Sequence, residues 1–355
     1  MTVGEAMAAA RAWVRRNAAA NPDLVAAYLA GSLNRLAADT PVPSSSDVDV
    51  HVIQPRRGTW SAGERYRGAL IQCTVTSLDP TSSEAVLADP FESHGVLFGA
   101  VLADPRGVLA PLRRSAASAY ADYPWVAARC EGAVQSAHGW LDLLDRQAGA
   151  DLEWASAILA WAVSGLAAAL ALAAVREPGG RKCLLMAREV LQAAGRPELH
   201  ERLLAALGVD RLTSKRVARY HREGLEFFDR AVAVHRTRVP GDDQLHEYYR
   251  AYVTAGAEEI IDQGHHREAM WRIHRTCYPA CRVLLADAPH AERLRCRAWW
   301  GGLRRDLGLE TERDVRRRGA SVRVLAGDVL ATALDIARGR VSAPSAAAES
   351  APGEP

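Results

Sequence analysis

The chain has 355 residues, a length that suggests about two domains and allows a full hydrophobic core without disulfide or metal cross-links. Hydrophobic residues make up 49% and charged residues 24%, which excludes a wholly disordered chain. The formal net charge of 44 − 42 = +2 excludes a strongly basic chromatin-type protein and an acidic solvating chain. Lys182 and Lys215 are the only lysines, and this arginine bias with abundant alanine favours a bacterial source.

Cysteine usage and the N-terminus favour a cytoplasmic protein. The six cysteines show no regular spacing, which is typical of reduced thiols, and the N-terminal residues show no secretion-signal pattern. Residues 154–175 carry no charge and are long enough to span a bilayer. Their high alanine content, interrupted by serine and glycine, favours instead a helix buried at the centre of a helical domain. We therefore expect no membrane insertion.

In chain order, the first third alternates helical and strand patterns. Residues 3–19 predict an amphipathic helix, and residues 24–30, 48–53, 70–76 and 96–102 predict strands. From about Leu112 the pattern is helical, with breaks at prolines and glycines near residues 123–124, 177–180, 195–197, 239–241 and 288–289. This predicts an α+β fold: a small domain over residues 1–112, with a mixed sheet and helices, and a larger all-α domain over residues 113–340. Residues 341–355 are expected to be a disordered tail.

The stretch from Leu29 to Ile53 carries the most informative motif. An apolar strand runs into Gly31-Ser32, where glycine lets the backbone approach a ligand and a helix start favours anions. Asp47 and Asp49 lie two residues apart on the next strand, so both carboxylates point the same way. Paired carboxylates suit Mg²⁺, which takes oxygen ligands and shares its shell with substrate phosphates. The alternative is a plain hairpin with turn-favouring serine and aspartate.

Gly31-Ser32 with Arg35, followed by Ser46-Asp47-Val48-Asp49, resembles the signature of the DNA polymerase β-type nucleotidyltransferase superfamily. Within it, the chain is most similar to the bacterial aminoglycoside nucleotidyltransferase-like proteins, in which a helical domain follows the transferase domain. The resemblance implies that Gly31, Ser32 and Arg35 hold the phosphates of a nucleoside triphosphate, with ATP favoured. It also implies that Asp47 and Asp49 bind Mg²⁺, two ions in all.

The third carboxylate of that family is missing from its usual place. The next strand carries Gln72 there, and glutamine cannot take a proton from the acceptor hydroxyl. Another carboxylate could replace it, namely Asp79, Glu84, Asp89 or Glu92; the metal ions could suffice; or the protein binds nucleotide without transferring it. Because nucleotidyl transfer depends mainly on positioning and charge stabilisation, retained activity is favoured. Asp47, Asp49 and Gln72 are the candidate catalytic residues.

Several weaker signals accompany this motif. Lys182 follows a Pro-Gly-Gly break, and in the resembled superfamily a basic residue of the helical domain faces the triphosphate, so Lys182 is a further candidate for nucleotide binding. His51 is expected to be a hydrogen-bonded strand histidine rather than an acceptor contact. His265, His266, His274, Cys277 and Cys281 look superficially like metal ligands, but Pro279 is expected to interrupt their helix.

The function expected from these observations is Mg²⁺-dependent transfer of a nucleoside monophosphate to a hydroxyl of a small polar acceptor, aminoglycoside-like, with release of pyrophosphate. Two alternatives stay open: nucleotidylation of a protein or transfer RNA, as in antitoxin-like minimal nucleotidyltransferases, and a catalytically impaired nucleotide sensor. Arginines near residues 293–318 are interspersed with acids, which favours a solvated helix face over a nucleic-acid surface. The sequence does not indicate an oligomeric state.

Overall fold

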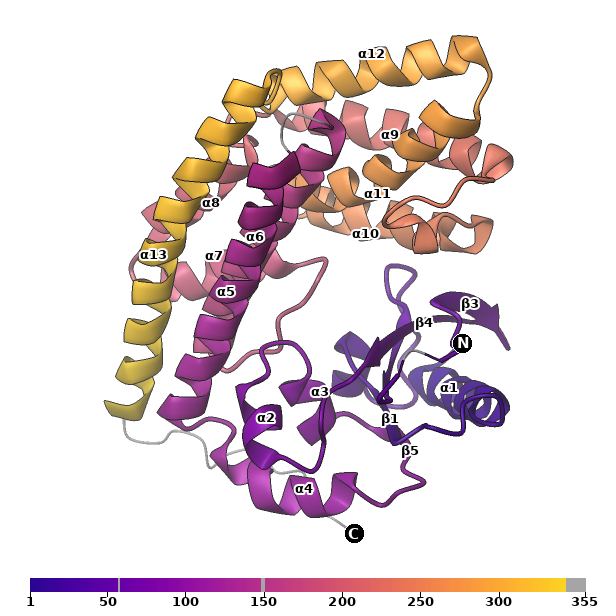
Figure 1. The fold of residues 1–355 in the computed structure, drawn as a ribbon, viewed down its shortest axis with the longest axis vertical. Coiled ribbons are helices and arrows are strands. Elements are labelled where there is room, and N and C mark those ends of the chain that lie inside the picture. Colours follow the sequence, from indigo (N-terminus) through magenta and orange to yellow (C-terminus); the bar gives the residue numbers. More distant parts are fainter. Residues whose placement is uncertain (57, 148–150, 343–355) are drawn as a thin grey trace.

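The computed structural model describes residues 1–56, 58–147 and 151–342, and its strands all come from the N-terminal part of the chain. The strands are β1 (Ala26–Leu29), β2 (Val48–Ile53), β3 (Gly63–Tyr66), β4 (Ala69–Thr76) and β5 (Val101–Ala103). The helices of this part are α1 (Val3–Ala18), η1 (Ser32–Arg35), α2 (Ser83–Ala88), α3 (Ser93–Phe98), α4 (Leu109–Ala116) and η2 (Ala117–Ala119). The fold is α+β, with this sheet-containing part followed by a larger helical region (Figure 1).

The five strands form one mixed sheet in the order β3-β4-β2-β1-β5. Strands β2 and β4 are parallel, and the other neighbouring pairs are antiparallel. In this register Asp49 lies opposite Gln72, and His51 lies opposite both Thr74 and Tyr28. Since partnered residues of neighbouring strands point to the same face, the pairing gathers Asp49, His51 and Gln72 on one side of the sheet.

Helices cover both faces of the sheet. Helix α1 packs on one face, where Trp13, Leu29 and Val50 are fully buried. It begins with a capping box in which Thr2 and Glu5 satisfy each other's backbone amides. Helices α2, α3 and α4 cover the β1 side of the opposite face through a second apolar cluster that includes Tyr28. The Asp49 and Gln72 side of that face meets the helical region instead.

The helical region is built around α6 (Leu152–Ala173), the long apolar segment of the sequence. Its apolar window is 83% buried inside the protein, and α5 (Tyr123–Gln147) and α13 (Glu312–Ser342) run beside it (Figure 1). By length and composition it could cross a membrane, but its burial confirms the expectation of a central core helix. The remaining helices are α7 (Cys183–Ala193), α8 (Pro197–Leu207), α9 (Ser214–Val234), η3 (Asp242–Gln244), η4 (Glu247–Tyr249), α10 (Arg250–Asp262), α11 (His266–Asp287) and α12 (His290–Asp306).

Most predicted elements and breaks agree with the structure, but the strand expected over residues 96–102 is wrong. Val96 and Leu97 belong to α3 and are buried in the cluster around Tyr28, and only Val101–Ala103 forms a strand. Gly99 ends α3 before the strand begins, and it packs so closely against β1 that a Cβ there would collide with the carbonyl oxygen of Leu29. A short apolar run has no period that distinguishes a buried helix from a strand. Strand β3 was not predicted, since its sequence, Gly-Glu-Arg-Tyr, lacks apolar alternation.

The expected interruption at Pro279 is also wrong, because α11 continues from His266 to Asp287 through this proline. A proline inside a helix removes one backbone hydrogen bond, but α11 is buried along most of its length, and such packing can offset the loss. The tail predicted to be disordered falls almost entirely on residues 343–355, which lie outside the described residues.

Candidate nucleotide and metal site

The site is organised by the turn at Gly31, immediately after β1. Ala30 donates its backbone N–H to the carbonyl oxygen of Asp49 at 2.9 Å, which fixes the turn against β2. Gly31 has φ +74°, and a Cβ at this position would meet the Asp49 carboxylate at a distance that real Cβ atoms do not reach. Glycine is therefore required both for the backbone conformation and for the close approach of the carboxylate. The helix expected at Ser32 is only the four-residue 3₁₀ turn η1, and Ser32 is exposed.

Asp47, which is buried, and Asp49, which is half-buried, form a pair of neighbouring carboxyls. Burial raises the pKa of Asp49 well above its usual value, and the neighbouring charge of Asp47 raises it further. Burial likewise raises the pKa of Asp47, although the charge of Arg272 opposes the shift. The Oδ2 atom of Asp47 is buried and has no hydrogen-bond partner among the residues that the structure describes. Two desolvated carboxylates with an unpartnered oxygen fit a hard divalent cation such as Mg²⁺, which would relieve their repulsion.

A metal ion here would need further ligands from substrate or water. Over the described parts of the chain, no group of three or more His, Cys, Asp or Glu side chains is arranged to hold a metal ion. This is compatible with Mg²⁺, which usually takes one or two carboxylates and completes its octahedral shell with water and substrate phosphates.

The helical region supplies a buried cation to this pair. Arg272 on α11 is 3% exposed and stacks over the ring of Tyr252 with 4.4 Å between the guanidinium carbon and the ring centroid. Within the described parts of the chain, its Nε and Nη2 atoms have no hydrogen-bond partner. Burial lowers the pKa of Arg272, and the charge of Asp47 is among the influences that raise it. The positive charge therefore comes from a residue more than 200 positions away in the chain.

Gln72 connects the sheet to the helical region. Its Oε1 accepts a hydrogen bond from Nε2 of Gln244 at 3.1 Å, and Oε1 of Gln244 accepts one from Nη1 of Arg272 at 3.4 Å. Next to it, Tyr248 donates its hydroxyl to the carbonyl oxygen of Gly63 at 2.9 Å. Gln72 therefore stands beside Asp49 as the first member of a polar chain that ends on the buried arginine.

Lys182 lies at another contact between the two parts of the protein. Lys182 and Arg181 both pair with the carboxylate of Glu259 on α10, and Nη1 of Arg181 lies 2.9 Å from it. The same carboxylate accepts a hydrogen bond from the hydroxyl of Ser45 at 2.9 Å. Ser45 precedes Asp47 by two residues, so this cluster holds the segment that leads into the candidate metal pair. Lys182 is thus close to the site, with its ammonium group engaged by Glu259.

Glu177, which the sequence did not single out, reaches the turn from the connection between α6 and α7. Its Oε1 accepts the N–H of Gly31 at 2.9 Å, and its Oε2 pairs with Nη1 of Arg35 at 2.9 Å. His94 Nδ1 lies 3.6 Å from the same Oε2. The carboxylate is 12% exposed. Gly31 and Arg35, both expected to hold phosphate, are therefore brought together on a carboxylate of the protein itself.

His51 is held by a carboxylate on the sheet face next to Asp49. Its Nδ1 lies 2.7 Å from Glu92, which also accepts the hydroxyl of Tyr28. This is the hydrogen-bonded strand histidine that was expected. Of the other carboxylates considered as replacements for the missing one, Asp79 accepts from Thr81 and lies on the surface. Asp89 accepts backbone amides of its own turn, at Phe91 and Glu92, so it is held locally.

An aromatic cavity of about 250 Å³ opens beside Gln244. Its polar lining includes Asp243, Gln244 and Arg275, and the charge of Arg275 is among the influences that lower the pKa of Asp49. The aromatic lining consists of Trp140, Trp161, Phe228 and Tyr278. Trp140 and Trp161 lie 4.7 Å apart between ring centroids. The Gln72–Gln244 hydrogen bond thus joins the strand that faces Asp49 to the wall of this cavity.

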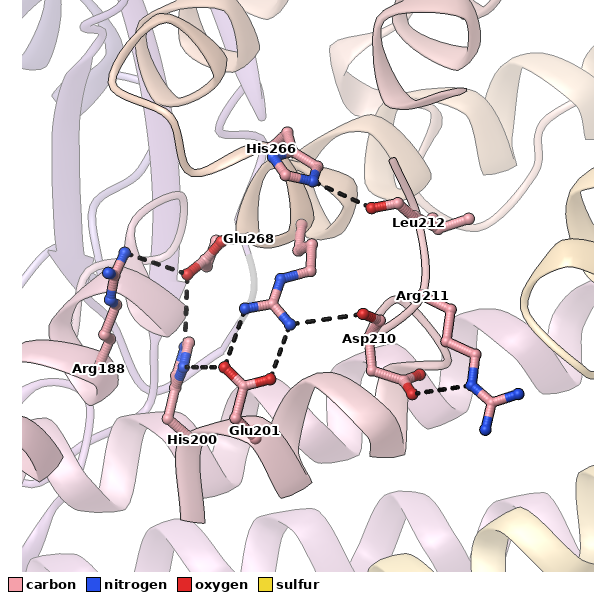
Figure 2. Close-up of polar contacts among 9 residues, drawn as sticks. Arg188, His200, Glu201, Asp210, Arg211, Leu212, His266 and Glu268 are labelled. Carbon is pink, nitrogen blue, oxygen red and sulfur yellow. Dashed lines mark hydrogen bonds and ion pairs between the residues drawn. The ribbon is translucent and has the colours of Figure 1, made fainter. Parts of the chain in front are cut away.

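A second polar cluster lies inside the helical region and ties α7, α8 and α11 together (Figure 2). Buried Glu268 lies 3.7 Å from both Arg188 and His200, and burial lowers the pKa of His200. His266 contacts the carbonyl oxygen of Leu212 at 3.0 Å. His265 lies against Arg188. Two of the histidines that resemble metal ligands in the sequence therefore contact other segments of the helical region, His266 the connection between α8 and α9 and His265 the helix α7.

The structure thus brings Gly31, Arg35, Asp47, Asp49 and Gln72 to one region and adds Glu177, Arg272, Gln244 and Glu259 from the helical region. Among these four residues, only Glu177 stands at a recognisable feature of the sequence, because it opens a Glu-Pro-Gly-Gly break. The other three are polar residues of a kind that is common in the helical region. No protein-family model and no curated protein sequence matches this chain.

Proposed function

We propose that the chain is a Mg²⁺-dependent nucleotidyltransferase that moves a nucleoside monophosphate from a nucleoside triphosphate, ATP in the first instance, to a hydroxyl of a small polar acceptor. The observation that carries the proposal is the pair of desolvated carboxyls, in which Asp49 packs against the turn at Gly31 and Asp47 feels the charge of the buried Arg272. Two desolvated carboxylates with an unpartnered oxygen are costly for stability alone, and such groups are concentrated at functional sites.

In this reaction the acceptor oxygen forms a bond to the α-phosphorus, the bond from that phosphorus to the bridging oxygen breaks, and pyrophosphate leaves. Asp47 and Asp49 would hold the magnesium, which supplies charge neutralisation and lowers the pKa of the acceptor hydroxyl. The N–H of Gly31 and the guanidinium of Arg35 would bind phosphate oxygens. Arg272 stabilises the negative charge of the aspartates and of the reacting phosphate in a buried setting, where electrostatic interactions are stronger than in water.

The absence of a carboxylate at Gln72 does not argue against transfer, because this type of reaction relies mainly on positioning and charge stabilisation. The hydrogen bond from Gln244 gives Gln72 a different role, since it fixes the strand of the site to the helical region. A glutamate at this position would add a third negative charge beside Asp47 and Asp49.

The aromatic cavity is the proposed acceptor site. Its tryptophans can stack on the apolar face of a ring, and Asp243, Gln244 and Arg275 can hydrogen-bond hydroxyl or amino substituents. A volume of about 250 Å³ suits a single ring with its substituents better than a macromolecule. This favours a small hydroxylated acceptor over a protein or transfer RNA.

The test is incubation of the protein with each α-labelled nucleoside triphosphate, Mg²⁺ and a panel of ring polyols and amino sugars. Label transferred to a small acceptor, together with pyrophosphate, supports the proposal, and Asp49→Asn should abolish both. Label on the protein itself, on an added protein or on transfer RNA would support nucleotidylation of a macromolecule instead. Nucleotide binding without pyrophosphate release across the whole panel would support a nucleotide sensor. Two observations favour that alternative: Gln72 stands where a carboxylate is expected, and Gly31 and Arg35 are already bound by Glu177.

A further inference from the structure

Glu177 places a carboxylate on the groups that the proposed function assigns to nucleotide phosphate. The Gly31 N–H and the Arg35 guanidinium each bind one of its two oxygens at 2.9 Å. This is the bidentate, charge-assisted arrangement by which proteins bind carboxylates and phosphates alike. While Glu177 is in place, neither the Gly31 N–H nor the Nη1 group of Arg35 can bind a phosphate oxygen.

The carboxylate also adds to a concentration of negative charge. Glu177 is among the charges that raise the pKa of Asp49, together with Asp47. A nucleotide phosphate arriving at this turn therefore meets three carboxylates, and one of them already occupies its hydrogen-bond donors. Displacing Glu177 frees the donors and removes one repelling charge in the same step.

The segment that carries Glu177 is built so that it leaves the helix sharply. Helix α6 ends in a motif in which Val175 donates its N–H to Leu172 and Arg176 donates to Ala171, at 2.8 and 3.0 Å. Val175 occupies the left-handed position of this motif, with φ +55°, where glycine is usual. A β-branched residue rarely adopts that conformation. Pro178-Gly179-Gly180 follows Glu177, so the carboxylate is carried by a short connection, residues 174–182, and not by a helix.

We infer that Glu177 occupies the phosphate position of the turn at Gly31 and that the triphosphate binds by displacing it. Glu177 is then a residue that sets the affinity for the triphosphate. The inference rests on the proposed function, because it takes the turn at Gly31 as the phosphate site.

The experiment measures equilibrium binding of inorganic tripolyphosphate and of a non-hydrolysable α,β-methylene ATP analogue, each with Mg²⁺, by titration calorimetry. Glu177→Gln keeps the shape of the side chain and removes its charge, so binding of both probes should tighten roughly tenfold, which corresponds to the loss of one modest charge-assisted contact in the free protein. Glu189→Gln is the matched control, since Glu189 is an exposed carboxylate that pairs with Arg176 at 2.7 Å near the same connection. Its affinity should equal that of the wild type.

A second measurement uses the wild-type protein alone and does not depend on how a variant folds. Amide hydrogen exchange with and without tripolyphosphate should become faster over residues 174–182 and slower at Gly31 and its neighbours. If the wild type binds the probes and Glu177→Gln binds them with the same or weaker affinity, the role of Glu177 is overturned and the proposed function stands. Unchanged or slower exchange over residues 174–182 when tripolyphosphate binds would overturn that role in the same way. Absence of any probe binding to wild type and variant would overturn both.

Discussion

Replacement of Gly31 by alanine tests whether the turn and the Asp49 carboxylate are packed as described. Gly31 has φ +74°, and an added Cβ would overlap the Asp49 carboxylate. Gly107 serves as a control for a positive φ alone, because it has φ +64° and a Cβ added there would meet no atom of the described residues within 4 Å. Gly31 has ψ −166° as well, a backbone conformation that is essentially restricted to glycine, so alanine is more strained there, and only at Gly31 must it also move the Asp49 carboxylate.

The magnitudes follow from these two contributions. An L-residue at a positive φ such as that of Gly107 costs about 1–2 kcal/mol, and one in the glycine-only region of Gly31 costs about 1–3 kcal/mol. Overpacking a filled site costs typically about 1–3 kcal/mol more. We therefore expect Gly31→Ala to lower the free energy of unfolding by about 2–6 kcal/mol and Gly107→Ala by about 1–2 kcal/mol. The reduced freedom of the unfolded chain affects both variants equally and cancels in the comparison.

The assay is urea unfolding followed by circular dichroism, with Asp49→Ala added alone and in combination with Gly31→Ala. Removing the carboxylate should recover the overpacking part of the loss at Gly31, about 1–3 kcal/mol, since residues in direct contact do not act additively. Equal losses for Gly31→Ala and Gly107→Ala, or a loss from Gly31→Ala that is the same with and without the Asp49 carboxylate, would refute the packing of Asp49 over Gly31.

Three further outcomes follow from the charges of the site. The raised pKa of Asp49 means that the folded protein binds more protons than the unfolded chain as pH rises from 3.8 to the folded-state pKa, so this carboxyl makes stability fall over that window. Asp49→Asn should therefore stabilise the metal-free protein at pH 7 in urea unfolding while abolishing pyrophosphate release, and a loss of stability would contradict the burial of a charged pair. Gln72→Glu should leave turnover unchanged or raise it, because glutamate can still accept the hydrogen bond from Gln244; a large loss would assign Gln72 a specific role. Arg272→Met should lower the free energy of unfolding by about 3 kcal/mol or more, because it leaves the buried carboxylate charge without its cation. Lys182→Ala should lower it by less than about 1 kcal/mol, because the ammonium group is partly exposed. Comparable urea midpoints for the two variants would argue against Arg272 as the buried cation.

Local features of the chain were predictable from the sequence. The α+β order of elements and the breaks between helices follow from apolar periodicity and from proline and glycine positions. The burial of α6 follows from its composition, because a long uncharged run rich in alanine packs closely against other helices. The misassigned run at 96–102 shows the limit of this reasoning, since an apolar run of that length suits a helix as well as a strand.

By itself, the sequence determined where a tight turn and two neighbouring carboxylates stand, because both are local features of one short stretch of the chain. Only the tertiary structure decided what faces them. Glu177, Gln244 and Arg272 lie far along the chain, and Arg272 is one of 44 − 2 = 42 arginines with no local feature that sets it apart. A charged side chain on a helix can be solvated or buried against a distant partner, and the packing of helices against the sheet makes that choice. The acidic pair, its buried arginine and the carboxylate on the Gly31 turn therefore exist as one site only in the folded chain.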